Sequence, residues 1–230
     1  EEAVPALCRS KQVVIVGDEM QLPPTSFFST ALDEDEMQVV AEENGERISI
    51  VLDADSLLSQ AARNLPATLL AWHYRSRFEA LISFSNAAFY SGQLVTIPDR
   101  TRRTAQGPVE PVTSTDEEAW GLGVTRLLGA PITTHRMADG VYEGRINVPE
   151  ARYIAGLVRD LLARNTGQSI GIVAFSEAQQ SEIEAALDRM AAEDSDFAAA
   201  LEREYVREDD GQFNGLFVKN LENVQGDERD

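Results

Sequence analysis

The sequence predicts an α/β fold in which helices cover a parallel sheet. Short continuous apolar runs, such as 13–16 and 170–174, are bounded by polar or small residues, which is typical of strands buried on both faces. These runs alternate with longer segments of helical periodicity, and that alternation favours parallel βαβ units. With 230 residues, the chain can form one large domain or two small ones, each with its own core.

The N-terminal half is assigned in order to a strand at 11–18, a solvated helix face or loop at 25–49, a helix at 56–65, a strand at 67–77 and a helix at 78–90. The first helix can take Asp55 or Ser56 as its N-cap, and it ends before Pro66 because a residue preceding proline disfavours helix. The second helix is amphipathic, and Gly92 suits its C-terminal stop.

The C-terminal half is assigned to a loop at 98–123, a strand at 130–137, a helix at 147–165, a strand at 168–176, helices at 176–193 and 194–205, and a strand at 215–221. The loop assignment rests on the many Pro, Thr and Gly residues of that segment. Pro149 suits the first turn of its helix. Ser176 is the expected N-cap of the next helix, with Glu177 in its first turn.

The composition is that of an acidic globular chain. The formal net charge is -19, which disfavours a nucleic-acid binder because phosphate contacts require Lys and Arg. The single cysteine, Cys8, excludes an internal disulfide. No apolar run approaches the length of about 18 residues that a membrane span needs. A cytoplasmic location with no membrane contact is therefore expected.

Polar residues follow the predicted strands at four places: 17–21, 73–77, 176–180 and 222–228. Ligands of parallel α/β sheets bind at the carboxyl ends of strands, so these four corners are expected to face one edge. Taken singly, each corner is unspecific. Gly17-Asp18 could be an ordinary turn, and His73-Tyr74-Arg75 could be a satisfied surface cluster.

Taken together and in order, the corners resemble the motifs of superfamily-1 helicases. "GDEMQLPP" at 17–24 resembles motif III, which typically reads Gly-Asp-x-x-Gln-Leu-Pro-Pro. "WHYRSRFEALISFSNAAFYSGQL" at 72–94 resembles the motif IV region, and "FVKNLENVQGDERD" at 217–230 resembles motif V. The similarity is to the subgroup that contains the helicase of nonsense-mediated mRNA decay and large bacterial relatives.

This resemblance implies a RecA-like parallel sheet flanked by helices, as in the core of P-loop NTPase-type helicases. Residues 1–66 are then expected to be the C-terminal part of a first RecA-like domain that carries motif III. Residues 67–230 are expected to be a second RecA-like domain that is truncated within motif V. No Gly-x-x-x-x-Gly-Lys-Ser/Thr phosphate loop occurs in the sequence, so the core is expected to be incomplete and this chain alone inactive.

The resemblance also assigns the nucleotide-facing residues. Gln21 is expected to sense the γ-phosphate, and Arg75 to act as an arginine finger, because its planar, always charged guanidinium suits phosphate oxygens. Tyr74 resembles the family's adenine-stacking aromatic residue, and Glu228 resembles the carboxylate that bonds the ribose hydroxyls. The further residues expected at the nucleotide are Asp18, Gln225 and Gly226.

The expected nucleic-acid contacts are Ser176, Lys219 and Asn220, and the expected partners are single-stranded DNA or RNA and the remainder of the helicase core. The expected cofactors are ATP and Mg²⁺, with Mg²⁺ held mainly by upstream residues; no metal ligand is assigned here. A catalytically silent RecA-like regulatory or interaction module is the alternative. A metabolic nucleotide-binding enzyme is a weaker one, since no dinucleotide fingerprint occurs. DNA versus RNA, direction of movement and oligomeric state stay open.

Overall fold

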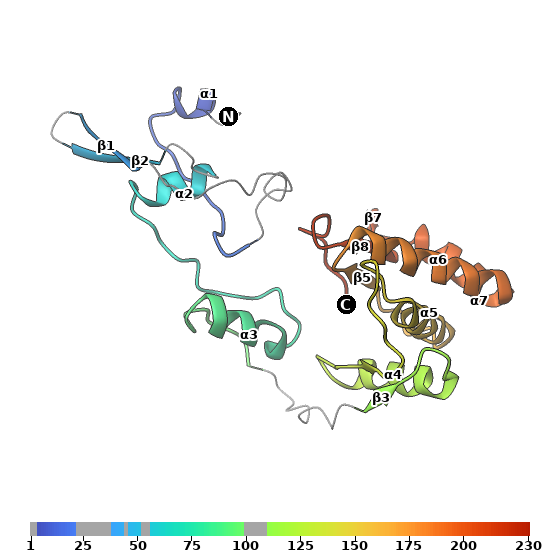
Figure 1. Ribbon diagram of the computed structural model, residues 1–230. Coiled ribbons are helices and arrows are strands. Elements are labelled where there is room, and N and C mark those ends of the chain that lie inside the picture. The colour runs from blue at the N-terminus through green and yellow to red at the C-terminus, as the bar shows by residue number, and fades with distance from the viewer. Residues whose placement is uncertain (1–3, 22–37, 44–45, 52–55, 99–109) are drawn as a thin grey trace. The chain divides into compact units, whose positions relative to one another are not determined.

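Two parallel strands, β5 (Gly171–Ala174) and β8 (Phe217–Asn220), organise the C-terminal part of the chain. Gly171 pairs with Phe217 and Ala174 with Asn220, so the carboxyl ends of both strands meet at one edge. The structure is a computed structural model that describes residues 4–21, 38–43, 46–51, 56–98 and 110–230 (Figure 1). Contacts divide the chain into two units, residues 1–72 and 73–230. Whether these units correspond to the two expected domains stays a prediction.

Three helices pack with one face of the β5–β8 pair: α5 (Val148–Ala163), α6 (Glu177–Glu193) and α7 (Ser195–Tyr205). The core is formed by Ala151, Ala155, Val158, Ile172, Ala174, Ile183, Ala186, Leu187, Phe197, Leu201 and Leu216. Alternate residues of β5 point away from these helices, because successive side chains of a strand face opposite ways. Val173 is accordingly 42% exposed, while Ala174 is 4% exposed.

Side-chain caps explain where these helices begin. The Asn147 Oδ1 accepts a hydrogen bond from the Glu150 N–H (3.3 Å), and Asp194 caps α7 in the same way. The predicted helices at 147–165, 176–193 and 194–205 are confirmed, as are the strands at 168–176 and 215–221, although both strands are shorter. A small antiparallel hairpin, β6 (Glu208–Asp209) and β7 (Gln212–Phe213), joins α7 to β8.

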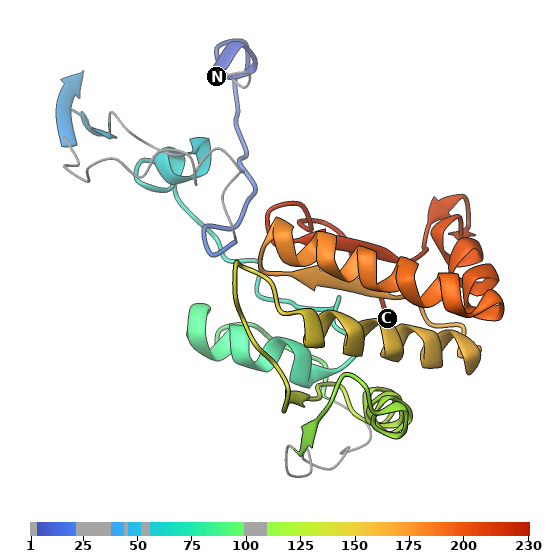
Figure 2. The same cartoon turned by 45° about the vertical axis from the view of Figure 1, so that its right-hand side comes forward.

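The predicted loop at 98–123 is wrong where α4 (Glu117–Gly129) begins. Asp116 caps this helix, and Figure 2 shows α5 lying between α4 and α6. Gly123 suggested a loop, yet here it allows close packing, since a Cβ at this position would lie 2.8 Å from the Leu157 Cδ2. Residues 99–109 of the predicted loop lie outside the described residues.

The strand expected at 130–137 is much shorter than predicted. Only β4 (Arg136–Met137) forms, and it pairs in parallel with β3 (Pro111–Val112). The helix expected at 78–90 forms as α3 (Glu79–Phe89), and Gly92 follows it with a φ of 70°. None of the helices in the described part of the chain is long and apolar enough to cross a membrane.

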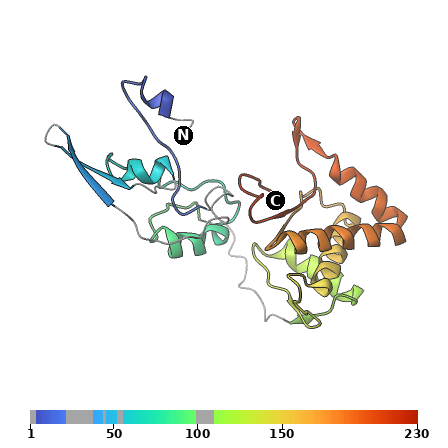
Figure 3. The same cartoon turned by 45° about the horizontal axis from the view of Figure 1, so that its top comes forward.

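The first unit contains α1 (Val4–Leu7), the strands β1 (Gln38–Glu43) and β2 (Glu46–Val51), and α2 (Leu57–Ala62). The two strands form an antiparallel hairpin (Figure 3), so the helix face or loop expected at 25–49 is wrong for β1 and β2. Asn44 and Gly45 separate the strands in the sequence, and this dipeptide is typical of two-residue hairpin loops. Residues 22–37 lie outside the described residues. Helix α2 begins at Ser56, as expected.

Two predicted strands of this region do not form. Residues 11–18 adopt no strand, and Val14 and Val16 are each 77% exposed. Residues 67–77 contain a single bridged residue, Trp72. Segments rich in β-branched and aromatic residues have side chains that fit a pleated surface. Such a segment forms a strand only where neighbouring strands supply hydrogen bonds. No described strand pairs with 11–18.

Candidate functional site

The corner at 17–21 is held by the carboxylate of Asp18. Its Oδ1 accepts a hydrogen bond from the Met20 N–H (3.0 Å), and its Oδ2 accepts one from the Gln21 Nε2 (3.0 Å). Gln21 is exposed, and its backbone N–H also bonds to the Asp18 carbonyl (3.4 Å). Asp18 therefore orients the amide of Gln21, the residue expected to sense a phosphate.

A second turn presents Tyr74 and Arg75. The Nε2 of His73 accepts a hydrogen bond from the Ser76 N–H (3.1 Å) and lies 2.7 Å from the Ser76 hydroxyl. The His73 N–H donates to the Val95 carbonyl (3.0 Å), which ties the turn to the segment after α3. Tyr74 is 78% exposed and Arg75 is exposed, and within the described residues neither side chain has a hydrogen bond or ion pair.

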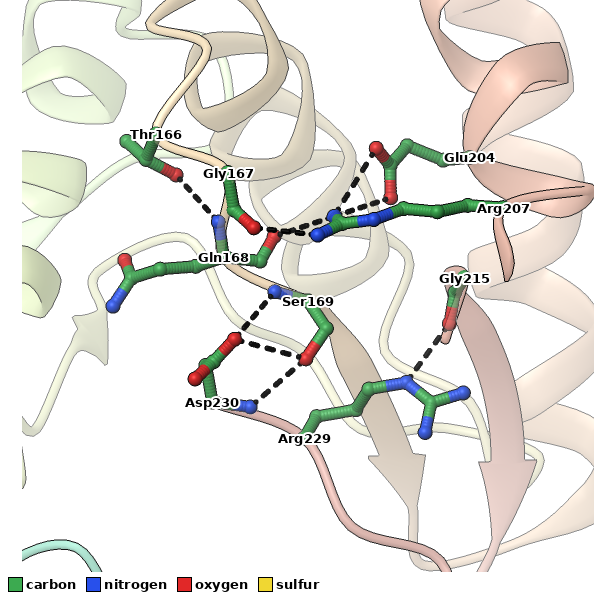
Figure 4. A network of polar contacts seen from close by, with 9 residues as sticks. All are labelled: Thr166, Gly167, Gln168, Ser169, Glu204, Arg207, Gly215, Arg229 and Asp230. Atoms are coloured by element: carbon green, nitrogen blue, oxygen red, sulfur yellow. Dashed lines mark hydrogen bonds and ion pairs between the residues drawn. The ribbon is translucent and has the colours of Figure 1, made fainter. Parts of the chain in front are cut away.

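Arg77 connects this turn to the end of the chain. Its Nη1 lies 3.2 Å from the Oδ1 of Asp230. The other carboxylate oxygen of Asp230 accepts hydrogen bonds from the Ser169 N–H (3.0 Å) and hydroxyl (3.2 Å), as Figure 4 shows. The Ser169 N–H is the main cause that lowers the pKa of Asp230, with Arg77 contributing less. Ser169 precedes β5, so Asp230 lies at the amino end of that strand.

The segment after β8 forms a tight turn. The Asp227 N–H bonds to the Val224 carbonyl (3.0 Å), and Gly226 occupies the third position with a φ of 91°. A positive φ at this position is what type II turns require. Gln225, Gly226 and Glu228 are all exposed. The Nζ of Lys219 pairs with the Asp227 carboxylate at 2.5 Å, which holds the turn against β8.

Glu228 is followed by two residues that lie at the amino end of the strands. The next residue, Arg229, donates from Nε to the Gly215 carbonyl (2.9 Å), just before β8 begins, and its guanidinium carbon lies 4.7 Å from the centre of the Phe217 ring. Figure 4 shows Arg229 and Asp230 side by side across the start of the two strands. The chain has therefore returned from the carboxyl end of β8 to its amino end.

Ser176 and Asn220 lie at the opposite, carboxyl end of the strands, and each is only 7% exposed. The Ser176 hydroxyl accepts from the Gln179 N–H (3.1 Å) and donates to the Arg145 carbonyl (2.9 Å). The Asn220 Oδ1 accepts from the Asn223 N–H (3.1 Å). Both side chains therefore shape the backbone of their loops. Sequence analysis had passed over Arg145, whose position beside Ser176 carried no sequence signal.

Two of the predicted site residues, Ser176 and Asn220, lie at the carboxyl end of the β5–β8 pair. Arg77, two residues after Arg75, pairs with Asp230 at the amino end. The expectation that the polar corners face one edge is therefore wrong for the corner at 73–77. Asp18 and Gln21 belong to the other unit.

Three of the predicted site residues have side chains whose chemistry suits a nucleotide. An exposed aromatic ring, an exposed guanidinium and an exposed carboxylate suit a base, a phosphate and a ribose, and Tyr74, Arg75 and Glu228 supply these groups. Among the described residues, no three His, Cys, Asp or Glu side chains come together as a metal site.

Comparison with known proteins gives consistent results. A family model described as an AAA domain matches residues 54–230. The whole chain is 29% identical over 232 residues to the "Uncharacterized ATP-dependent helicase MG140" of Mycoplasma genitalium. It is 30% identical over 231 residues to the "Uncharacterized ATP-dependent helicase MG140 homolog" of Mycoplasma pneumoniae. The chain spans 18% of the length of each of these relatives. No solved structure matches it.

Proposed function

This chain belongs to the AAA domain family and is a superfamily-1 helicase chain with an α/β RecA-like fold, and from that premise we propose that it is part of an ATP-dependent helicase or translocase. In this proposal, ATP hydrolysis between two RecA-like domains drives movement along single-stranded DNA or RNA. The cofactors are ATP and Mg²⁺.

The exposed turn at His73–Ser76 carries the proposal. Arg75 is exposed, and no described residue pairs with it. Its guanidinium is available for a ligand, while the His73–Ser76 hydrogen bonds fix the backbone beneath it. This arrangement suits an arginine finger, which stabilises the charge that develops on a transferred phosphoryl group.

Other residues are proposed to bind the nucleotide together with Arg75. Tyr74 offers a ring for the adenine, and Glu228 offers a carboxylate for the ribose hydroxyls. Gly226 lets the backbone turn without a side chain beside the phosphates. Gln21, oriented by Asp18, acts as a neutral hydrogen-bonding sensor, and Gln225 links the nucleotide to the nucleic acid.

The nucleic-acid contacts are proposed at the carboxyl end of the strands. Ser176 and Asn220 shape the backbone there, and Lys219 reaches the same edge from β8. Because Asp227 pairs with Lys219, a phosphate would have to compete with this carboxylate for the ammonium group. The turn that contains Gly226 is therefore linked, through Asp227, to Lys219, which is proposed to contact the nucleic acid.

The test is the ATPase rate of the full-length protein with and without single-stranded DNA or RNA. Strong stimulation is expected. If no nucleic acid stimulates hydrolysis, the motor is refuted, and a silent regulatory module, which the net charge of -19 favours, takes its place. The 230-residue chain by itself is expected to show no turnover of Mg-ATP, because it lacks the phosphate-loop lysine.

A further inference from the structure

Phe175 follows β5 at its carboxyl end, its neighbour Ser176 donates a hydrogen bond to the backbone carbonyl of Arg145, and neither Phe175 nor Arg145 was assigned a role above. We propose that they form a base-and-phosphate subsite for single-stranded nucleic acid, in which Phe175 stacks on a base and Arg145 contacts the adjacent phosphate. This inference rests on the proposed function and adds to it two residues that touch the nucleic acid directly.

Phe175 immediately follows β5 and is 89% exposed, more than any other large apolar side chain that the structure describes. A phenyl ring left in water forgoes the free energy that burial would give it. Proteins that bind single strands use such rings as stacking platforms, since every base has a π-face. An exposed aromatic ring at a sheet edge where polar loops converge matches that use.

Arg145 lies in an unusual backbone conformation. Glu143 and Ile146 exchange backbone hydrogen bonds of 2.9 and 3.1 Å, and the two residues between them, Gly144 and Arg145, have φ of 60° and 66°. Two successive positive φ values define a type I′ turn, which favours Asn-Gly and disfavours arginine. A non-glycine residue in this conformation is strained.

Two buried side chains at the start of α6, the N-cap Ser176 and Gln179, hold this turn in place. The Ser176 hydroxyl donates to the carbonyl of Arg145 (2.9 Å). Gln179, 7% exposed, accepts from the Asn147 N–H (2.6 Å) and donates to the Asn147 carbonyl (3.3 Å). Buried polar groups that hydrogen-bond to a strained turn fix the position of its backbone. They thereby fix the point from which its side chains extend. Ser176 and Gln179 are therefore positioning residues for Arg145.

The charge of Arg145 is available to a ligand. The residue is exposed, and its guanidinium makes no hydrogen bond or ion pair with any residue in the described ranges. Glu143 lies two residues before Arg145 and Glu177 lies two residues after Phe175, so the described residues at this end of the sheet do not form a basic patch. The subsite therefore contributes a single phosphate contact and one stacked base.

The test is fluorescence anisotropy of the full-length protein with labelled oligodeoxythymidine and, in a second arm, oligouridine, titrated at several salt concentrations. Phe175→Ala is expected to weaken binding about tenfold, and Phe175→Trp to restore it. Arg145→Asn removes the charge but tolerates the positive φ, and it should lower the slope of log affinity against log salt by about one. Arg145→Lys should keep most of the slope.

Thermal unfolding of each variant checks that the fold is intact. This inference would be overturned if the wild type binds, Phe175→Ala binds with the same affinity, and Arg145→Asn shows the same slope of log affinity against log salt. The helicase proposal would then still stand. Absence of wild-type binding to both oligonucleotides would overturn the helicase proposal and this inference together. The two arms also show whether deoxyribose or ribose strands are preferred.

Discussion

Arg77 and Asp230 are separated by 153 residues in the sequence, and their side chains form an ion pair of 3.2 Å between Nη1 and Oδ1. Because Asp230 also accepts two hydrogen bonds from Ser169, the pair joins the turn of Arg75 to the amino end of β5. The same aspartate closely follows Glu228. One carboxylate thus holds together the two segments that are proposed to meet the nucleotide.

Asp230→Asn should reduce the free energy of unfolding at neutral pH by about 1 kcal/mol, since hydrogen bonds to a charged group are lost in a partly exposed site. The pKa of Asp230 is lowered from 3.8, mainly by the Ser169 N–H, so its stabilisation is present above 3.8 and is lost as the pH falls through the folded-state pKa. Urea denaturation at several pH values measures this effect. A difference in unfolding free energy between wild type and Asp230→Asn that stays constant as the pH falls below 3.8 would contradict this prediction.

His135 should make the protein less stable in mild acid. Burial, and to a lesser degree Arg126, lower its pKa from 6.5, so the folded state favours the neutral ring. The stabilisation is complete above 6.5 and is lost as the pH falls from 6.5 towards the folded-state pKa. Its Nδ1 lies 2.8 Å from the hydroxyl of Tyr153, which is 2% exposed. Melting temperatures of wild type and His135→Asn should depend differently on pH across this range. An identical dependence of the melting temperature on pH would refute this role of His135.

Gly156→Ala should destabilise the protein although alanine favours helix. A Cβ at Gly156 would lie 2.8 Å from the Trp120 Cγ and still closer to other ring atoms, so the packing of α5 on α4 would have to change. Gly129→Ala in α4 is the matched control, because a Cβ there meets nothing within 4 Å. That control should be stabilising by up to about 1 kcal/mol. Equal effects of the two substitutions on urea denaturation would contradict this packing.

Gly226→Ala should weaken binding of a non-hydrolysable ATP analogue to the full-length protein. The φ of 91° disfavours any residue with a Cβ, although the space around the position is open. Gly226→Asn should bind better than Gly226→Ala, because asparagine tolerates the third position of a type II turn. The two variants differ in backbone preference and not in available room. If both bind the analogue as tightly as wild type, the turn does not shape the nucleotide site.

The sequence predicted the elements whose local chemistry was strong. Ser56 and Ser176 cap their helices as expected, and the apolar run at 170–174 became a parallel strand paired with β8. Helix α4 was missed because its glycines resemble a loop, while the packing of Gly123 on α5 depends on residues far along the chain. The hairpin of β1 and β2 was missed although Asn44-Gly45 indicated it.

The site was predicted less completely than the fold. The motifs selected Tyr74, Arg75 and Glu228, all of which are exposed. The sequence could not show that Arg77 and Asp230 lie at the amino end of the strands while Ser176 and Asn220 lie at the carboxyl end, because this separation depends on how the chain returns after β8. Nor could it show that the hydroxyl of Ser176 is spent on its own helix and on the turn of Arg145.

The most direct test of the central claim is the nucleic-acid-stimulated ATPase rate of the full-length protein that carries Arg75→Ala. The account predicts a fall of about 10³-fold or more in this rate, as for other arginine fingers, while binding of the ATP analogue changes little. Arg136→Ala is the matched control, since Arg136 is also exposed and has no ion pair with a described residue. A stimulated rate for Arg75→Ala within a few-fold of the Arg136→Ala rate would contradict the account.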